Sequence, residues 1–442
     1  MADVNQYLVR LIPTTAIKPM RAINLSTLLY RTRIAATKHF AMPKSCGLVI
    51  LLVLSSNLAA RAKTKLEPSR DPNYEAELIF PLHPKHNHAP SIVECPNGDL
   101  LASWFRGAGE READDVAIFG ARRKKDAKEW SEPFVMADTP GFPDGNTAMH
   151  IDRQGRLWLF WPLVLANTWE SCVPHYRVSE NYEGPGTPDW KWQSAIFLKP
   201  QNFAATMKEG LAHRLKLADK PLDDAATTKK LAELKKLFDD KLASRLGWQV
   251  RCKPTVLPSG RMLLPLYSDT FSVGLMAISD DEGKSWFASE PLAGFGNIQP
   301  SVLRRSDGTL VAYMRENGPL HKIRIAESRD EGITWGPVGV AELPNPGSGL
   351  DGVVLRNGHW LLVYNDTISK RASLAVSLSE DEGRTWKWTR HLERESSGSY
   401  HYPAMIQAKD ERIHVVYSYF VKGGKSMKHA AFNEEWIKQG DK

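Results

Sequence analysis

Residues 279–286 read SDDEGKSW, and nearly the same letters return as SRDEGITW at 328–335 and as SEDEGRTW at 379–386. In each copy an aspartate precedes a glycine by two positions, and a Ser or Thr followed by Trp ends the motif. Such an aspartate can accept hydrogen bonds from backbone N–H groups inside a hairpin loop, and the glycine tolerates a positive φ. The final tryptophans are 49 and 51 residues apart. We therefore interpret the octets as structural loops that mark a repeat of about fifty residues.

A second pattern occurs six times and extends the repeat along the chain. Each copy consists of an apolar run, a turn with glycine or charged residues, and another apolar run, which is typical of a β-hairpin. These hairpins begin at His88, Asn146, Lys253, Gln299, Leu350 and Tyr402. With the strand before each octet, a unit has about four strands. Six such units predict an all-β fold, a six-bladed β-propeller, to which residues 74–80 supply a closing strand.

One interval of the repeat is longer than the others. Residues 203–246 are rich in Ala, Leu and Lys, and Leu231, Leu234, Leu237 and Phe238 would share one face of a helix. We predict a helical insertion of about 45 residues within the propeller, with two helices separated by Pro221. The insertion is expected either to cover the site as a lid or to pack against the flank of the propeller.

The N-terminal residues 1–62 have a different character from the rest of the chain. From Met42 the sequence gives a positive residue, Lys44, then an apolar run at 47–54, then the small-x-small motif Ala-Arg-Ala at 60–62. This order is typical of a secretory signal peptide that is too short to span a bilayer stably, although an anchoring or buried hydrophobic helix is the alternative. We predict a true start at Met42, export to the periplasm or the outside of the cell, and a propeller formed by residues 63–442.

Composition limits the classes of partner. The net charge of +7 is mild, and no run of Lys or Arg indicates nucleic-acid binding. After removal of Cys46 with the signal peptide, Cys95, Cys172 and Cys252 would remain, an odd number without metal-site spacing. We therefore predict buried free cysteines, no bound metal and no cofactor. The oligomeric state is not predicted.

The octets and hairpins together resemble the sialidase (neuraminidase) superfamily of BNR-repeat, or Asp-box, proteins. The resemblance covers residues 75–438 and includes the stretches GNIQPSVL, LPNPGSGLDGVVL and YHYPAMIQ. It implies a six-bladed propeller and an exo-α-sialidase-like glycoside hydrolase. Because one fold supports many reactions, the activity has to be argued from the site itself.

The fold predicts where that site lies. The innermost strands of a propeller start around one mouth of the central channel, so the first residues of the six hairpins should converge on one concave site. The candidates from these starts are His88, Asn146, Lys253, Gln299, Asp351 and Tyr402. The loops after the second strands should rim the same mouth with Arg106, Glu110, Asp114, Asp115, Asp269, Arg315 and Asn365.

The resemblance also implies roles for some of these residues. Arginines would clamp the carboxylate of an acidic sugar, and Arg315 resembles one arginine of that clamp. Tyr402 resembles the nucleophile that forms a covalent intermediate. Glu110, or Asp115 in its place, would be the general acid that protonates the leaving oxygen.

Two positions depart from the sialidase pattern. His88 stands where the family has an arginine, and Gln299 stands where the family has the glutamate that activates the tyrosine. A neutral amide cannot take the phenol proton. Lys253 and Arg251 are predicted to replace the lost positive charge, so that an anionic substrate still fits.

Three functional hypotheses follow. The first is an exported hydrolase that removes a terminal acidic sugar from a glycan. The second is a polysaccharide lyase or non-sialic glycosidase acting on uronates, with His88, Tyr402 and Lys253 in acid–base roles. The third is a glycan-binding propeller without catalysis. Each of the main candidate residues also has a structural explanation. Tyr402 could be a core aromatic, Arg315 could pair with Glu316, and Glu110 could belong to a solvated charge run.

Overall fold

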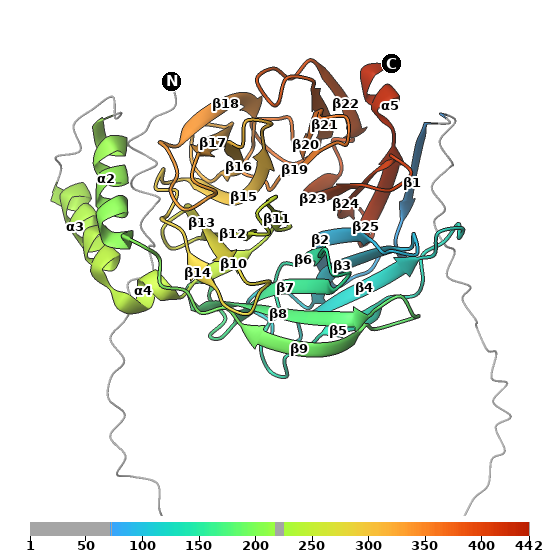
Figure 1. Ribbon diagram of the computed structural model, residues 1–442, viewed down its shortest axis with the longest axis horizontal. Coiled ribbons are helices and arrows are strands. Elements are labelled where there is room, and N and C mark those ends of the chain that lie inside the picture. The colour runs from blue at the N-terminus through green and yellow to red at the C-terminus, as the bar shows by residue number, and fades with distance from the viewer. Residues whose placement is uncertain (1–70, 72, 217–224, 442) are drawn as a thin grey trace, which may run out of the picture. The chain divides into compact units, whose positions relative to one another are not determined.

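The computed structural model describes residues 71, 73–216 and 225–441. Within these residues six antiparallel sheets follow one another around a ring, which confirms the six-bladed propeller (Figure 1). The innermost strands of neighbouring blades contact one another around the axis. The sheet faces between blades are filled by apolar side chains, so the core lies between the blades, not in one central layer.

The blades are numbered in chain order. The first blade contains β2 (His86–Glu94), β3 (Leu100–Gly107), β4 (Ala117–Arg123) and β5 (Phe134–Ala137). The second contains β6 (Ala148–Ile151), β7 (Leu157–Val164), β8 (Cys172–Asn181) and β9 (Asp189–Ala195). The third contains β10 (Trp248–Val250), β11 (Thr255–Val256), β12 (Met262–Ser268), β13 (Val273–Ser279) and β14 (Phe287–Ala288).

The fourth blade contains β15 (Asn297–Arg304), β16 (Leu310–Glu316), β17 (Lys322–Ser328) and β18 (Gly339–Pro344). The fifth contains β19 (Asp351–Val354), β20 (Trp360–Tyr364), β21 (Leu374–Ser379) and β22 (Trp388–Glu393). The sixth contains β23 (Ser399–Gln407), β24 (Ile413–Val421), β25 (Gly424–Phe432) and β1 (Tyr74–Leu78), and α5 (Glu434–Lys438) follows it.

The ring is closed by the two ends of the propeller sequence. Strand β1 pairs antiparallel with β25, from Tyr74 opposite Phe432 to Leu78 opposite Lys428. The predicted closing strand is therefore confirmed. It leaves no unpaired edge at β25, the last strand of the chain, because β1 takes up its hydrogen-bonding groups.

The repeated octets form the loops between the last two strands of blades three, four and five. In the last copy the Asp381 carboxylate accepts hydrogen bonds from the backbone N and the Oγ1 of Thr385, at 2.8 and 2.7 Å. Gly383 has φ +80°, and its N–H donates to Ser379 Oγ at 2.8 Å. The other two copies repeat this geometry. The structural interpretation of the octets is confirmed.

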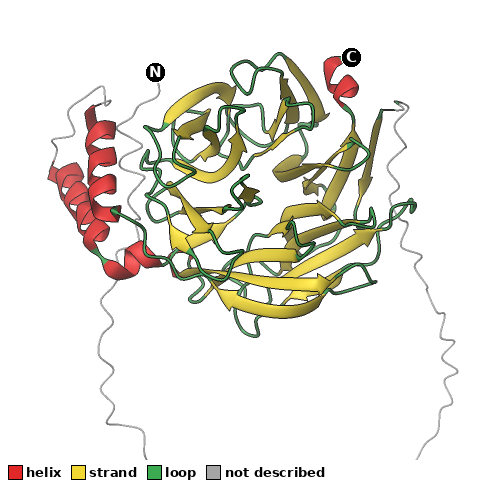
Figure 2. Cartoon of the chain, in the orientation of Figure 1, coloured by secondary structure: helices red, strands yellow, loops and turns green. Residues whose placement is uncertain are grey.

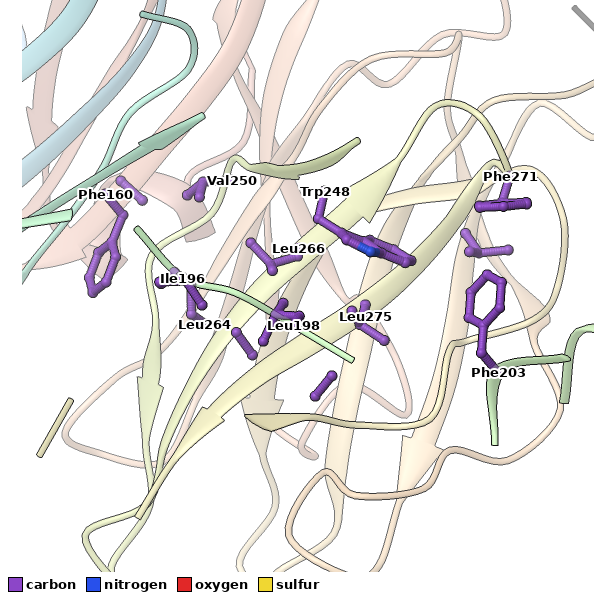
Figure 3. Close-up of a cluster of buried hydrophobic side chains, with 14 of the residues drawn as sticks. Phe160, Ile196, Leu198, Phe203, Trp248, Val250, Leu264, Leu266, Phe271 and Leu275 are labelled. Atoms are coloured by element: carbon purple, nitrogen blue, oxygen red, sulfur yellow. The ribbon is translucent and has the colours of Figure 1, made fainter. Parts of the chain in front are cut away.

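The long interval forms a helical insertion, drawn in red in Figure 2. Its helices are α2 (Phe203–Lys216), α3 (Ala225–Asp239) and the short α4 (Lys241–Arg245), which the sequence did not predict. Pro221 lies outside the described residues. The buried face of α2 packs on the third blade, where Phe203 meets Phe271 with ring centroids 5.1 Å apart, next to Trp248 (Figure 3). The described part of the insertion therefore packs on the propeller flank.

The predicted signal peptide at 1–62 and the start at Met42 lie outside the described residues. No helix in residues 73–216 or 225–441 is long and apolar enough to cross a membrane. Cys95, Cys172 and Cys252 are buried and free, as the sequence predicted.

Candidate active site

Three inner strands are interrupted by a bulge directly before a proline. At these bulges Ala89, Gln299 and Tyr402 have φ values of +52°, +56° and +47°. The strand register breaks at the same places, on β2, β15 and β23. A non-glycine residue in this left-handed region is strained, and such strain often marks sites where a bulge re-aims a side chain. Gln299 and Tyr402 both face one pocket as a result.

That pocket lies at the axis end where the inner strands begin, and all six blades contribute to it. Its volume is about 250 Å³. It is lined by His88, Phe105, Glu110, Asn146, Trp169, Tyr267, Asp269, Gln299, Arg315, Arg371 and Tyr402. The predicted convergence of hairpin starts and rim loops therefore occurs for His88, Asn146, Gln299, Tyr402, Glu110, Asp269 and Arg315.

The Tyr402 hydroxyl is held by side chains of the fourth blade. Arg315 Nη1 donates to it at 2.7 Å, and Gln299 Nε2 donates at 3.1 Å. The Gln299 Oε1 atom is buried without a hydrogen-bond partner among the described residues. An amide can present either end to a phenol, so Gln299 can orient the Tyr402 hydroxyl but cannot remove its proton.

Three guanidinium groups surround the Tyr402 ring. The central carbons of Arg251, Arg371 and Arg315 lie 5.0, 5.6 and 5.9 Å from the ring centroid. Arg251 is 1% exposed and donates to the Pro403 carbonyl, so it supports Tyr402 from behind the pocket. Arg315 and Arg371 line the pocket itself. The Tyr402 ring is therefore surrounded by three positively charged groups, one of which also contacts its oxygen.

His88 packs flat against the same tyrosine. The two ring centroids are 4.3 Å apart, and His88 Nδ1 shares a 2.8 Å hydrogen bond with Ser418 Oγ. Burial, together with the nearby histidines and arginines, lowers the pKa of His88 well below its usual value. The imidazole is neutral at neutral pH. It does not replace the positive charge of the family's arginine.

Glu110 lines the pocket from the loop after β3. His86 Nε2 is 3.2 Å from Glu110 Oε1. This contact is the main reason why the pKa of Glu110 is lowered. Its carboxylate is therefore ionised at neutral pH. Asp115, the alternative acid, instead binds Lys85 and the Ala108 N–H, both at 2.7 Å, and does not line the pocket.

The third blade supplies a polar wall. Tyr267 accepts a hydrogen bond from Asn146 Nδ2 at 3.0 Å and donates to Gln249 Oε1 at 3.1 Å. The amide of Gln249 in turn donates to Asp269 Oδ2 at 2.8 Å. Burial raises the pKa of Asp269, although Arg315 opposes this shift.

Several predicted binding residues lie outside the pocket-lining set. Lys253 Nζ contacts Asp351 Oδ2 at 2.6 Å, and both groups are engaged in holding inner strands together. Arg106 packs over Phe80 and Phe119, at 4.7 Å from each ring centroid, on the flank of the first blade. The rim candidates Asp114 and Asn365 bind neighbouring loops. The expected position in the pocket lining is therefore wrong for Lys253, Asp351, Arg106 and Asp115, and for Arg251, which lies behind the pocket. Contact of these residues with a substrate stays a prediction.

The structure adds residues that the sequence did not identify. Arg371 reaches the pocket from the loop between β20 and β21, where its Nη2 donates to the Gly347 carbonyl at 2.7 Å. Trp169 reaches it from a single helical turn, residues Trp169–Ser171, and lies beneath the guanidinium of Arg111 at 5.0 Å. Arg371 follows the second strand of its blade, as the predicted rim residues do. This position in the repeat could have identified Arg371 as a rim residue from the sequence.

Comparisons with known proteins agree with this architecture. A family model described as a BNR repeat-like domain matches residues 98–220 and 239–415. The sialidase of Micromonospora viridifaciens is 24% identical over 376 residues, which are 79% of this chain and 51% of the relative, so the chain spans about half of that protein.

Solved structures share the fold at low identity. A Dyadobacter fermentans protein of unknown function has a TM-score of 0.61 and 16% identity, over 82% of this chain and 100% of that one. The NanB sialidase of Streptococcus pneumoniae has a TM-score of 0.60 and 13% identity, over 82% of this chain and 71% of that one. At these identities the likeness concerns the fold alone.

Proposed function

This chain belongs to the BNR repeat-like family of the sialidase superfamily, and we propose that it is a glycoside hydrolase that removes a terminal acidic sugar from a glycan. One observation carries the proposal. Arg315 and Arg371 line the same pocket as Tyr402 and Glu110, so carboxylate-binding and reactive groups meet at one point.

The pocket suits the end of a glycan chain. A volume of about 250 Å³ is at the small end for ligand sites and accommodates one sugar residue better than an internal segment. Guanidinium groups bind carboxylates through charge-assisted hydrogen bonds. The sugar carboxylate would lie against Arg315 and Arg371, which places the sugar ring beside the Tyr402 oxygen.

In the proposed reaction, the Tyr402 oxygen forms a bond to the anomeric carbon while the bond from that carbon to the leaving oxygen breaks. Glu110 gives its proton to the leaving oxygen. The surrounding guanidinium groups stabilise negative charge on Tyr402 as the phenol proton passes to water in the pocket. Water then attacks the anomeric carbon as the bond from that carbon to the Tyr402 oxygen breaks, and the Glu110 carboxylate takes the water's proton. The Tyr402 phenolate regains a proton from water in the pocket, and the free sugar leaves.

The role of Glu110 gives the proposed reaction a pH signature. Because contact with His86 lowers the pKa of Glu110, its proton-donating form is scarce at neutral pH. The kcat/KM value is therefore expected to rise as the pH falls into the acid range.

The proposal is tested by incubating the protein with sialosides, glucuronides, galacturonides and neutral glycosides, and by measuring the released sugar. We expect release of an acidic sugar, and loss of that release in Tyr402→Phe. Tyr419→Phe is the matched control, because Tyr419 is a tyrosine of the same blade outside the pocket. Unchanged release by Tyr402→Phe would remove Tyr402 as nucleophile, and release of neutral sugars alone would overturn the proposed substrate class.

A polysaccharide lyase is the second candidate, and the stacked pair of His88 and Tyr402 favours it. A neutral imidazole can take the proton next to a uronate carboxylate, and the Tyr402 phenol can protonate the leaving oxygen. The same incubations distinguish the two reactions, since elimination produces an unsaturated uronate that absorbs ultraviolet light. Binding of acidic sugars without any product would instead indicate a glycan-binding propeller.

We also propose that the protein is exported, on the basis of the signal-like segment at 42–62. Fractionation of expressing cells should place a shortened chain, beginning near Lys63, outside the cytoplasm. A full-length chain in the cytoplasm would contradict this proposal.

A further inference from the structure

Asp269 is a pocket carboxylate that the proposed reaction does not use. It follows β12 directly and lines the pocket together with Arg315 and Tyr267. Its Oδ2 atom accepts the hydrogen bond from Gln249. Asp269 is half-buried, and its Oδ1 atom, which accepts no side-chain or backbone hydrogen bond among the described residues, is open to the pocket. A ligand that displaces water from this oxygen has to supply a hydrogen-bond donor in its place.

The position of Asp269 beside Arg315 limits what that ligand can be. The two side chains interact electrostatically without forming a contact ion pair among the described residues. If Arg315 binds the sugar carboxylate, the group that meets Asp269 must be a hydrogen-bond donor close to that carboxylate. A sugar hydroxyl next to the carbon that carries the carboxylate meets this requirement.

The two common classes of acidic sugar differ at this point. In a hexuronic acid the carboxylate is attached to C5, and the neighbouring C4 carries a hydroxyl. In a 3-deoxy-2-ulosonic acid, such as sialic acid, the carboxylate is attached to C2, and the neighbouring C3 is a methylene group. A methylene group placed against Asp269 would displace water from the carboxylate oxygen without supplying a donor, and this weakens binding.

We infer that the pocket selects a terminal hexuronic acid with a free 4-hydroxyl, which Asp269 recognises while Arg315 and Arg371 bind the carboxylate. This inference rests on the proposed function, because it uses the same pocket. It adds a specificity-determining role for Asp269. It also fits an exo-acting enzyme, since an internal uronate linked through O4 has no hydroxyl at that position.

The test measures binding to the full chain by calorimetry with three probes: methyl glucuronoside, its 4-deoxy analogue and methyl α-sialoside. Loss of a hydrogen bond to a charged group corresponds to about a 10- to 150-fold change in affinity. We expect the glucuronoside to bind more tightly than the 4-deoxy analogue by a factor in this range, and more tightly than the sialoside. In Asp269→Ala the glucuronoside and its 4-deoxy analogue should bind equally.

Asp269→Asn and Asp115→Asn complete the set. Asp269→Asn keeps the side-chain shape and should reduce the 4-hydroxyl preference in part, whereas Asp115→Asn, outside the pocket, should leave it unchanged. If Asp269→Ala does not fold, the comparison of the two glucuronosides on the unaltered protein still decides the question.

Each result has a separate meaning. Tighter binding of the sialoside, or equal binding of the two glucuronosides to the unaltered protein, would overturn the inference about Asp269 and leave the proposed function standing. Failure to bind any of the three acidic sugars would contradict the proposed function itself.

Discussion

Replacing Asp351 with alanine should destabilise the propeller without changing which sugars its pocket prefers. Asp351 is 1% exposed and accepts hydrogen bonds from Lys253 Nζ at 2.6 Å, Ser301 Oγ at 2.9 Å and the Met405 N–H at 2.9 Å. These donors belong to the third, fourth and sixth blades, so one carboxylate ties four blades together near the axis. Removing one partner of a buried ion pair costs about 3–5 kcal/mol.

The magnitude should lie at the lower end of that range, about 3 kcal/mol, because the Lys253 side chain is 26% exposed and water can solvate its ammonium group once Asp351 is gone. Urea unfolding followed by tryptophan fluorescence measures the change. The double variant Lys253→Met/Asp351→Leu should recover much of the loss, since it removes both charges. A loss below about 1 kcal/mol in Asp351→Ala, or no recovery in the double variant, would refute the scaffold role.

Three further predictions concern the pocket, pH and the repeated loops. Gly349→Ala would place a Cβ 2.9 Å from Tyr402 Cδ1, so sugar affinity or turnover should fall about 10- to 100-fold with little change in stability, and unchanged activity would contradict the packing. Burial lowers the pKa of His414 to about 2 and the pKa of His429 well below its usual value, so the folded state binds fewer protons than the unfolded state below about pH 6.5. The free energy of unfolding should therefore drop by about 2 kcal/mol per histidine between pH 7.5 and pH 5. Thermal melts of the unaltered protein and of His414→Gln at the two pH values measure this drop. Asp381→Ala removes three hydrogen bonds from one octet loop and should cost about 2 kcal/mol in urea unfolding while leaving sugar binding intact.

The fold could be predicted because its determinants are local and repeated. The octets are hairpin loops whose Asp, Gly and Trp act within eight residues, and their spacing gave the blade period. The same period exposed the insertion at 203–246. The short helix α4 was missed because five residues carry no periodic apolar pattern, although Asp240 caps the helix through the Ala243 N–H.

The site could be predicted only in part, because its geometry depends on contacts between blades. The starts of the hairpins indicated the position of the pocket, and His88, Gln299 and Tyr402 all line it. Lys253 binds Asp351 of another blade. No local sequence pattern indicates such a contact between blades. Arg371 was not predicted for a similar reason. It lies in the irregular loop between β20 and β21, and the path of that loop, which brings the side chain to the pocket, has no sequence pattern.

The central claim is that Arg315 and Arg371 make this pocket a carboxylate site. The most direct measurement compares, by calorimetry, the acidic sugar that binds best with the same sugar in which the carboxylate is reduced to a hydroxymethyl group. We predict at least about tenfold tighter binding of the acid to the unaltered protein, and loss of most of that preference in Arg371→Gln. Equal binding of the acid and the neutral sugar to the unaltered protein would contradict the account.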